Sequence, residues 1–369
     1  MKVLHFYKSY YPDGVGGAEK VIHQICESCK ALGVESEVLT LTKNSDESSI
    51  MVDNHLVHRC RASFTLASTP FSAKVVKQFL QRAKQADIIH LHFPYPYADL
   101  VYLLSRIKKP VVVTYHSDIV KQKQFLKLYR PLKHFLMRKS AQIIATSPNY
   151  LASSSVLSKY KNKVTTIPIA ICEKEYAVAP NKVDYWQAQL GKDFFLFVGV
   201  LRYYKGLHIL LESAKNKPYK VVIVGAGPIE EELKVQAIKL QLTNVIFLGA
   251  IKNVDKSALF HLCKGVVFPS HLRSEAFGIT LLEGAVFSKP LVSSEIGTGT
   301  SYINVHNETG LVVPPSDAGA LAEALDKLWS NPELAETFGK NARKRYEQYF
   351  QVDSMAKSYV DVYKNVLKK

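Results

Sequence analysis

The stretch FFLFVGVLRYYKGLHILLESAKNKPYKVVIVGAG, residues 194–227, decides the fold class. Two apolar runs of strand length, FFLFVGV and YKVVIVG, enclose a segment long enough for a helix. Strands that are apolar at nearly every position are buried on both faces, which is typical of parallel sheets covered by helices. The pattern therefore predicts an α/β protein. Similar runs recur at residues 2–7, 35–41, 56–60, 87–93, 110–116, 142–147, 163–168, 244–249, 265–270, 290–294 and 310–315.

This alternation occurs twice along the chain, which predicts two domains. A chain of 369 residues is long enough for each half to bury a core of its own. We expect an N-terminal Rossmann-like domain at residues 1–172, a polar linker at 173–193 and a second Rossmann-like domain at 194–350. Residues 351–369 form an amphipathic helix that we expect to pack back on the N-terminal domain. Two such doubly wound sheets direct the carboxyl ends of their strands toward a shared central cleft.

The composition is that of a soluble globular protein, with 47% hydrophobic and 22% charged residues. No apolar run approaches the roughly 18 residues that a membrane span needs. The first residues do not have the pattern of a signal peptide, so we expect a cytoplasmic protein. Five cysteines do not suggest a disulfide framework, and we interpret Cys26 and Cys29 as core residues of a helix.

The net charge of +16 favours an anionic partner. A nucleic-acid-binding protein is the alternative from another class, and it would interleave basic and aromatic residues on a reading helix or sheet. The basic residues instead concentrate in KQKQFLKLYRPLKHFLMRK, residues 121–139, which has seven Lys or Arg and no acid. We predict an interfacial helix on anionic lipid, with a surface helix on the core as the alternative. Pro131 is expected to kink or split it. Apolar residues recur there at Phe125, Leu128, Leu132, Phe135 and Leu136.

Glycines follow the first strand in GVGGAE, residues 14–19. Gly14, Gly16 and Gly17 allow the backbone to approach a ligand closely, and the helix that they open presents free N–H groups. This pattern predicts a phosphate or sugar site. A flexible turn between strand and helix is the plainer interpretation.

The loops of the second half contain groups suited to a diphosphate. Arg202 and Lys205 follow the strand that opens this half, and their cationic heads match phosphate oxygens. Gly225 and Gly227, in GAGP, end the next strand. GAGP lacks the third glycine and the downstream acid of a dinucleotide fingerprint, so we do not expect NAD.

Two glutamates flank a turn in SEAFGITLLEGAVFSKPLV, residues 274–292. Glu275 follows the end of a strand, and Gly278 and Ile279 begin a helix whose N–H groups can hold phosphate or sugar oxygens. Glu283 lies inside that helix, where its carboxylate can accept hydrogen bonds from two vicinal hydroxyls. Together these features describe a nucleotide-sugar site.

Histidines stand at the ends of strands in the first half. His116 ends a strand at the level where ligands bind in such sheets, which makes it a candidate site residue. His90 and His92, in IIHLHF, are interpreted as structural residues.

With these motifs the chain resembles the family 4 retaining glycosyltransferases of the GT-B fold over essentially its full length. The matching pieces are GVGGAE, TYHSD, YYKG, GAGP, SEAFGITLLE and EIGTGTSYI. The resemblance implies transfer of a hexose from a nucleoside diphosphate with retention of the anomeric configuration. EIGTGTSYI resembles the bacterial mannosyl- and rhamnosyltransferases that build surface polysaccharides. That likeness implies GDP-mannose as donor and a lipid-linked saccharide as acceptor, as in O-antigen and lipopolysaccharide synthesis.

The resemblance also implies roles for single residues. By analogy Lys205 and Arg202 pair with the diphosphate, Glu283 holds the ribose and Glu275 contacts the transferring sugar. His116 touches the sugar or the acceptor. The family often has an arginine where this chain has Val200, which leaves open whether Arg202 reaches the diphosphate. The other residues of the implied nucleotide-sugar site are Gly17, Gly225, Gly227, Phe277, Gly278 and Ile279.

The sequence contains no D-x-D pair, so we expect neither a metal nor another cofactor. Cationic side chains and helix N-termini would neutralise the diphosphate instead. By analogy with the family, the leaving diphosphate takes the acceptor proton. A UDP-sugar-dependent transferase or synthase with a soluble acceptor is the alternative enzyme. We expect a protein of the cytoplasm that binds peripherally to the inner face of the plasma membrane.

Overall fold

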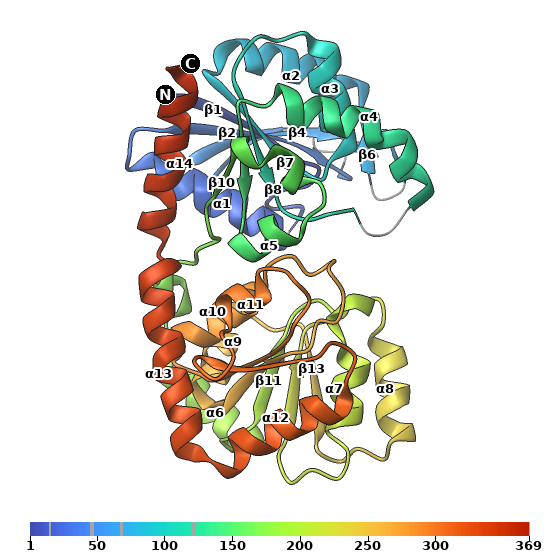
Figure 1. Ribbon diagram of the computed structural model, residues 1–369, viewed down its shortest axis with the longest axis vertical. Coiled ribbons are helices and arrows are strands. Elements are labelled where there is room, and N and C mark those ends of the chain that lie inside the picture. The colour runs from blue at the N-terminus through green and yellow to red at the C-terminus, as the bar shows by residue number, and fades with distance from the viewer. Residues whose placement is uncertain (15, 45–47, 67–68, 120–122, 369) are drawn as a thin grey trace. The chain divides into compact units, whose positions relative to one another are not determined.

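A computed structural model describes all residues except 15, 45–47, 67–68, 120–122 and 369. The chain forms two compact units, one of Met1–Ala170 with Val352–Lys369 and one of Ile171–Gln351. Each unit is a mainly parallel sheet with helices packed on it, which confirms the predicted α/β class of two doubly wound domains (Figure 1).

The first unit is built on an eight-stranded sheet in the order β10-β9-β8-β7-β1-β2-β4-β3. Neighbouring strands are parallel except β3, which is antiparallel to β4. The strands are β1 Lys2–Phe6, β2 Glu35–Thr42, β3 Ser49–Val52, β4 His55–Arg61, β7 Ile88–Phe93, β8 Val111–Tyr115, β9 Gln142–Ala145 and β10 Val164–Thr166; β5 Phe64–Leu66 and β6 Thr69–Phe71 form a separate hairpin.

Helices cover both faces of this sheet (Figure 1). Helices α2, α3 and α4 lie next to one another on one face, whereas α1 and α14 pack together on the other. The last helix of the chain therefore belongs to the first unit. The helices are α1 Gly17–Lys30, α2 Ala73–Gln85, α3 Pro96–Ser105, α4 Lys123–Lys139, α5 Pro148–Ser153 and α14 Val352–Leu367, with the 3₁₀ helix η1 at Leu157–Lys163.

The second unit is built on a six-stranded, fully parallel sheet in the order β13-β12-β11-β14-β15-β16. Its strands are β11 Phe195–Val198, β12 Val221–Val224, β13 Val245–Gly249, β14 Gly265–Phe268, β15 Leu291–Ser294 and β16 Gly310–Val313. Its helices are α6 Pro180–Leu190, α7 Leu207–Ser213, α8 Glu230–Lys239, α9 Asn253–Leu262, α10 Ile279–Val286, α11 Thr300–Ile303, α12 Ala318–Ser330 and α13 Pro332–Tyr349; η2 Glu173–Tyr176 and η3 Tyr203–Lys205 are 3₁₀ helices.

Every apolar run predicted as a strand is a strand of one of the two parallel sheets. The predicted linker at 173–193 is wrong, because this segment contains η2 and α6 and belongs to the second unit. Pro180 occupies the first turn of α6, where its missing N–H does no harm. Trp186 Nε1 donates to Asp255 Oδ1 over 3.0 Å, and Lys182 Nζ lies 2.9 Å from the same oxygen, so α6 is fixed to α9.

The basic segment at 121–139 forms α4 from Lys123 onward, and residues 121 and 122 lie outside the described chain. The helix continues through Pro131 and is not split there. Leu136 is buried and Leu128 is 82% exposed, so the apolar residues divide between core and surface. Lys133 is buried, against the pattern of a solvated basic face. The side chain of Phe125 is not among those described.

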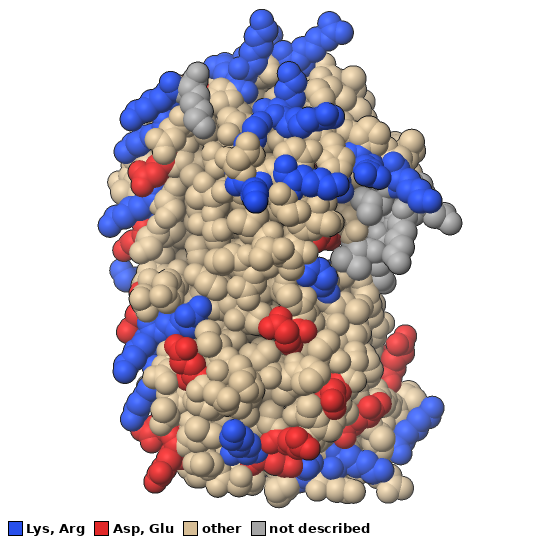
Figure 2. Space-filling view, in the orientation of Figure 1, with Lys and Arg blue, Asp and Glu red and all other residues tan. Residues whose placement is uncertain are grey.

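Almost all of the net positive charge belongs to the first unit. That unit has 28 Lys and Arg against 13 Asp and Glu, whereas the second has 20 against 19. Figure 2 shows basic side chains gathered over the first unit and both signs interspersed on the second. Among the described residues, no helix is long and apolar enough to cross a membrane.

Candidate functional site

The strand order of the second sheet locates the candidate site. From β11 the chain passes to β12 on one side and later to β14 on the other side. In such sheets ligands bind at the carboxyl ends of the strands where the order reverses, because the two following loops diverge there. The loops after β11 and β14 contain Arg202, Lys205 and Glu275, three of the predicted site residues.

Lys205 and Glu275 form an ion pair across this point. Lys205 Nζ lies 2.5 Å from Glu275 Oε2, and Ser270 Oγ lies 3.3 Å from the same oxygen. The ammonium also lies 4.5 Å from the centroid of the Phe268 ring, a favourable cation–π distance. Both charged side chains are largely removed from solvent, with exposures of 11% and 13%. The pair thus joins two loops in an environment of weak screening.

The glycines of the neighbouring loop allow close packing. A Cβ at Gly225, where φ is +131°, would lie 1.9 Å from the carbonyl oxygen of Gly199. A Cβ at Gly227 would lie 2.3 Å from the carbonyl oxygen of Leu201. The loops after β11 and β12 therefore require glycine in order to touch. Arg202 is exposed and is the N-cap of η3.

Helix α10 begins where the sequence predicts. Gly278 is its N-cap with φ +97°, in the left-handed region that favours glycine, and Ile279 is its first residue. Phe277 is buried just before it. Thr280 Oγ1 donates to the carbonyl oxygen of Val198 over 2.9 Å, which holds the helix start against the end of β11.

Glu283 is buried in α10 and accepts a hydrogen bond from Tyr176. The Tyr176 hydroxyl lies 2.9 Å from Glu283 Oε1. Burial, and then the charge of Glu283, raise the pKa of Tyr176, so this phenol remains a donor. Tyr176 falls in the segment interpreted as a linker, and no sequence motif indicated it.

His116 lies in the first unit, directly after β8. Its Nε2 is 3.0 Å from Nδ1 of His92, and its backbone N–H donates to the carbonyl oxygen of Phe93. Burial, assisted by the charge of Lys8, lowers the pKa of His116 to about 3. The imidazole is therefore neutral at physiological pH.

Gly17 begins α1, as the glycine motif predicts. The carboxylate of Glu19 folds back over the helix start, where a Cβ at Gly16 would lie 2.4 Å from Glu19 Oε2. Ser9 Oγ donates to Glu19 Oε1 over 2.5 Å. Because a carboxylate repels a phosphate, this helix start is better suited to a sugar hydroxyl.

Three buried histidines, His5, His90 and His92, have ring nitrogens within 4.8 Å of one another. Both nitrogens of His90 are already engaged, with the hydroxyls of Tyr363 and Thr114, each over 2.7 Å. A metal ion would have to displace these contacts, so hydrogen bonding accounts better for the cluster.

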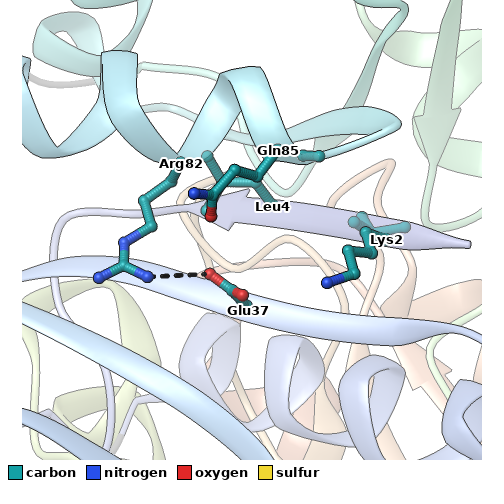
Figure 3. A pocket seen from close by; sticks show the side chains of 7 residues that line it. Lys2, Leu4, Glu37, Arg82 and Gln85 are labelled. Carbon is teal, nitrogen blue, oxygen red and sulfur yellow. Dashed lines mark ion pairs between the residues drawn. The ribbon is translucent and has the colours of Figure 1, made fainter.

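A small pocket of the first unit lies at the opposite ends of the strands (Figure 3). It is lined by Lys2 and Leu4 of β1, Glu37 of β2 and residues near the end of α2. Arg82 Nη1 pairs with Glu37 Oε2 over 3.7 Å within it. Ligands of doubly wound sheets bind at carboxyl ends, so this pocket is a poor candidate.

Comparisons with known proteins find two matching families and several relatives. Residues 15–172 match the family described as Glycosyltransferase Family 4, and residues 181–345 match Glycosyl transferases group 1. The chain is 52% identical to a D-rhamnosyltransferase of Pseudomonas aeruginosa, over 95% of this chain and 92% of that protein. It is 48% identical to the O-antigen chain mannosyltransferase C of Escherichia coli, over 100% and 99% of the two chains.

Solved structures with lower identity share the fold. A sucrose-phosphate synthase from Thermosynechococcus elongatus superimposes with a TM-score of 0.83 at 20% identity, covering 100% of this chain and 99% of that one. An Anabaena protein solved with UDP and glucose gives a TM-score of 0.82 at 20% identity, covering 99% and 100%.

Proposed function

The chain belongs to glycosyltransferase family 4 and is a glycosyltransferase of the GT-B fold, and on this premise we propose that it transfers mannose from GDP-mannose. The acceptor is a lipid-linked saccharide of O-antigen or a related surface polysaccharide. The product retains the anomeric configuration of the donor.

The proposal of mannose as the donor sugar rests on the names of the two similar relatives. One is a D-rhamnosyltransferase and the other a mannosyltransferase, at 52% and 48% identity. D-rhamnose is 6-deoxymannose, so the two sugars share every ring configuration and differ only by the hydroxyl on C6. GDP-D-rhamnose is therefore the second candidate donor. The guanine base is inferred from the motif EIGTGTSYI and not from a base-binding contact.

We assign the donor to the second unit. Glu275 contacts the transferring sugar, and Lys205 and Arg202 neutralise the diphosphate with the N–H groups at Gly278 and Ile279. Glu283 holds the ribose hydroxyls, oriented by Tyr176. Phe277 and the loops at Gly225 and Gly227 shape the walls. The 2.5 Å ion pair between Lys205 and Glu275 supports this assignment, because it brings the sugar group and the diphosphate group together.

In the transfer step, the acceptor oxygen forms a bond to the anomeric carbon while the bond from that carbon to the diphosphate breaks. The electron pair of the broken bond stays on the diphosphate oxygen, which takes the acceptor proton. Attack and departure occur on the same face of the sugar, so the configuration is retained. Lys205, Arg202 and the helix N–H groups stabilise the charge that develops on the diphosphate, without a metal.

The acceptor is assigned to the first unit, where His116 and the helix start at Gly17 offer hydrogen bonds to sugar hydroxyls. This unit has a net charge of +15, with 28 basic and 13 acidic residues. A surface of that charge suits an acceptor embedded in anionic lipid. We propose that the protein binds peripherally at the inner face of the plasma membrane.

The test uses the purified full-length protein and a panel of donors. Melting with excess GDP, UDP, ADP and dTDP should give one clear stabilisation, by GDP, of about 2.7 kcal/mol at a hundred times the dissociation constant. GDP-mannose should then support transfer to a lipid-linked saccharide, with the anomer of the product read by NMR. A shift with UDP alone would overturn the donor, and an inverted anomer would overturn the step. Turnover with a soluble saccharide alone would overturn the lipid acceptor.

A further inference from the structure

A chain of three imidazoles crosses the first sheet and ends at His116. His5 lies on β1, His92 on β7 and His116 just after β8, and these strands are neighbours in the sheet. His5 Nδ1 is 3.0 Å from His92 Nε2, and His92 Nδ1 is 3.0 Å from His116 Nε2. The ring of His92 is stacked between the other two, with its centroid 5.3 Å from that of His5 and 5.2 Å from that of His116.

All three rings are neutral. His5 and His92 are fully buried, and His116 is 8% exposed. Burial lowers the pKa of His5 to about 3 and that of His92 well below 6.5, as it does for His116. A neutral imidazole has one N–H and one bare nitrogen, so it donates from one side and accepts on the other. The proton positions in the chain are therefore correlated.

Only two arrangements make both hydrogen bonds. In one, each N–H points toward His5, and His5 Nε2 then carries a hydrogen. In the other, each N–H points toward His116, and His5 Nε2 is bare. No described residue offers His5 Nε2 a hydrogen-bond partner. Buried donors without a partner are rarer than buried acceptors without one, which favours the second arrangement.

We propose that His5 and His92 are positioning residues that hold His116 as the tautomer with its hydrogen on Nδ1. His116 then donates a hydrogen bond from Nδ1 to an oxygen of the sugar or the acceptor. No described residue accepts from His116 Nδ1. The ligand in this proposal rests on the proposed function, whereas the tautomer rests on the chain of imidazoles alone.

A fixed Nδ1–H also limits the chemistry of His116. Nε2 is occupied as an acceptor from His92, and Nδ1 holds a hydrogen, so no lone pair is left to take a proton from the acceptor hydroxyl. His116 is thereby a donor and not a general base. This agrees with a step in which the departing diphosphate takes that proton.

The tautomer is measured directly by NMR on full-length protein with ¹⁵N-labelled histidine. The shifts of the two ring nitrogens distinguish N–H from bare nitrogen, and a His116→Asn spectrum identifies the His116 signals. We expect a hydrogen on Nδ1 in the wild type. In His92→Leu the signals should move to the other tautomer or to an average. A wild-type hydrogen on Nε2, or an unchanged tautomer in His92→Leu, would overturn the proposal.

Two matched variants separate positioning from packing. His92→Asn keeps an amide near the place of Nδ1 and should keep the His116 tautomer. His90→Gln changes an equally buried histidine of the same strand that bonds Thr114 and Tyr363, outside the chain. It should lower stability without moving the His116 signals. Movement of those signals in His90→Gln would indicate general loss of packing and contradict the proposal.

Kinetics then test the hydrogen bond to substrate. His92→Leu should lose about tenfold in kcat/KM, the effect of one neutral hydrogen bond, and His92→Asn should stay within about twofold of the wild type. If the tautomer changes in His92→Leu while kcat/KM does not, the contact of His116 with substrate is wrong. If no donor supports turnover, the proposed function fails while the NMR result still decides the tautomer.

Discussion

Lys205 Nζ and Glu275 Oε2 lie 2.5 Å apart, across the point where the strand order of the second sheet reverses. Lys205 ends the loop after β11, and Glu275 belongs to the loop after β14. The residue assigned to the diphosphate and the residue assigned to the sugar are therefore direct partners. Removing either charge leaves the other poorly solvated and unpaired, so their effects on activity should not be additive.

Glu275→Gln should lower turnover by orders of magnitude and leave the Kd of GDP nearly unchanged. In the proposed role this carboxylate acts on the sugar in the transition state, whereas other groups hold the nucleotide. Steady-state kinetics and calorimetry measure the two quantities. Ser270→Ala, which removes only a neutral donor to Glu275, is the control and should keep most of the activity. Near wild-type turnover in Glu275→Gln would mean that its assigned role is wrong.

Glu283→Ala should weaken binding of GDP by about 1.5–3 kcal/mol, because charged hydrogen bonds to hydroxyls are lost. Tyr176→Phe is the matched control, since it removes only the hydroxyl group that donates to Glu283 and keeps the aromatic ring. It should cost about 1 kcal/mol or less in binding, as expected for a neutral donor. An unchanged Kd in Glu283→Ala would contradict the ribose contact.

Chelation should leave transfer intact. The diphosphate charge is assigned to Lys205, Arg202 and the start of α10, which need no divalent ion. Activity is compared before and after EDTA with the same donor and acceptor. Activity that disappears in EDTA and returns with magnesium or manganese would refute the metal-free step.

Reversing Lys127 and Arg130 to Glu should weaken sedimentation with anionic liposomes without lowering the melting temperature. Both side chains are exposed on α4, whereas Lys133 is buried and unsuitable for such a test. Each basic residue at such a surface contributes about 1 kcal/mol, so the loss should exceed tenfold.

The control for this change is the same double reversal at Lys327 and Lys344, exposed residues of the second unit. It alters the net charge equally and should leave liposome binding nearly unchanged. Equal losses in both variants would indicate an effect of total charge and not a surface on α4. If the wild-type protein does not bind anionic liposomes, the proposed membrane binding is wrong.

The free energy of unfolding should fall steeply below pH 6.5. Burial lowers the pKa of His5 and His116 to about 3 and that of His90 and His92 well below the ordinary 6.5. As pH falls through 6.5 the unfolded chain binds protons that the folded chain does not, so stability is lost. Each histidine contributes about 1.4 kcal/mol per pH unit in this range.

One carboxyl opposes this trend. Burial raises the pKa of Asp99 to about 7, so the folded chain gains one proton there and offsets about one histidine between pH 7 and 4. Urea denaturation at pH 7, 6 and 5 should therefore show a net uptake of protons on unfolding. His90→Gln should reduce the uptake by one. Stability that is flat from pH 7 to pH 5 would contradict the buried neutral histidines.

The sequence by itself determined the strands, the two parallel sheets and the start of α10 at Ile279. These features depend on residues that are close together in the sequence. A run of apolar residues forms a buried strand whatever its place in the sheet. A glycine can adopt the positive φ that the backbone needs at the start of a helix such as α10. The family motifs also predict Lys205, Glu275 and Glu283 as site residues. The motifs do not predict which side chain each of these residues contacts.

Only the tertiary structure decided those partners. Glu275 meets Lys205 from 70 residues away, and Glu283 meets Tyr176 from 107 residues away, inside a segment that looked like a linker. His5 and His92 are 87 residues apart and meet because β1 and β7 are neighbours in the sheet. Local patterns fix which residues form a strand, but the order of strands is set by packing of the whole sheet. Contacts between side chains on different strands follow from that order, so they are absent from any short stretch of sequence.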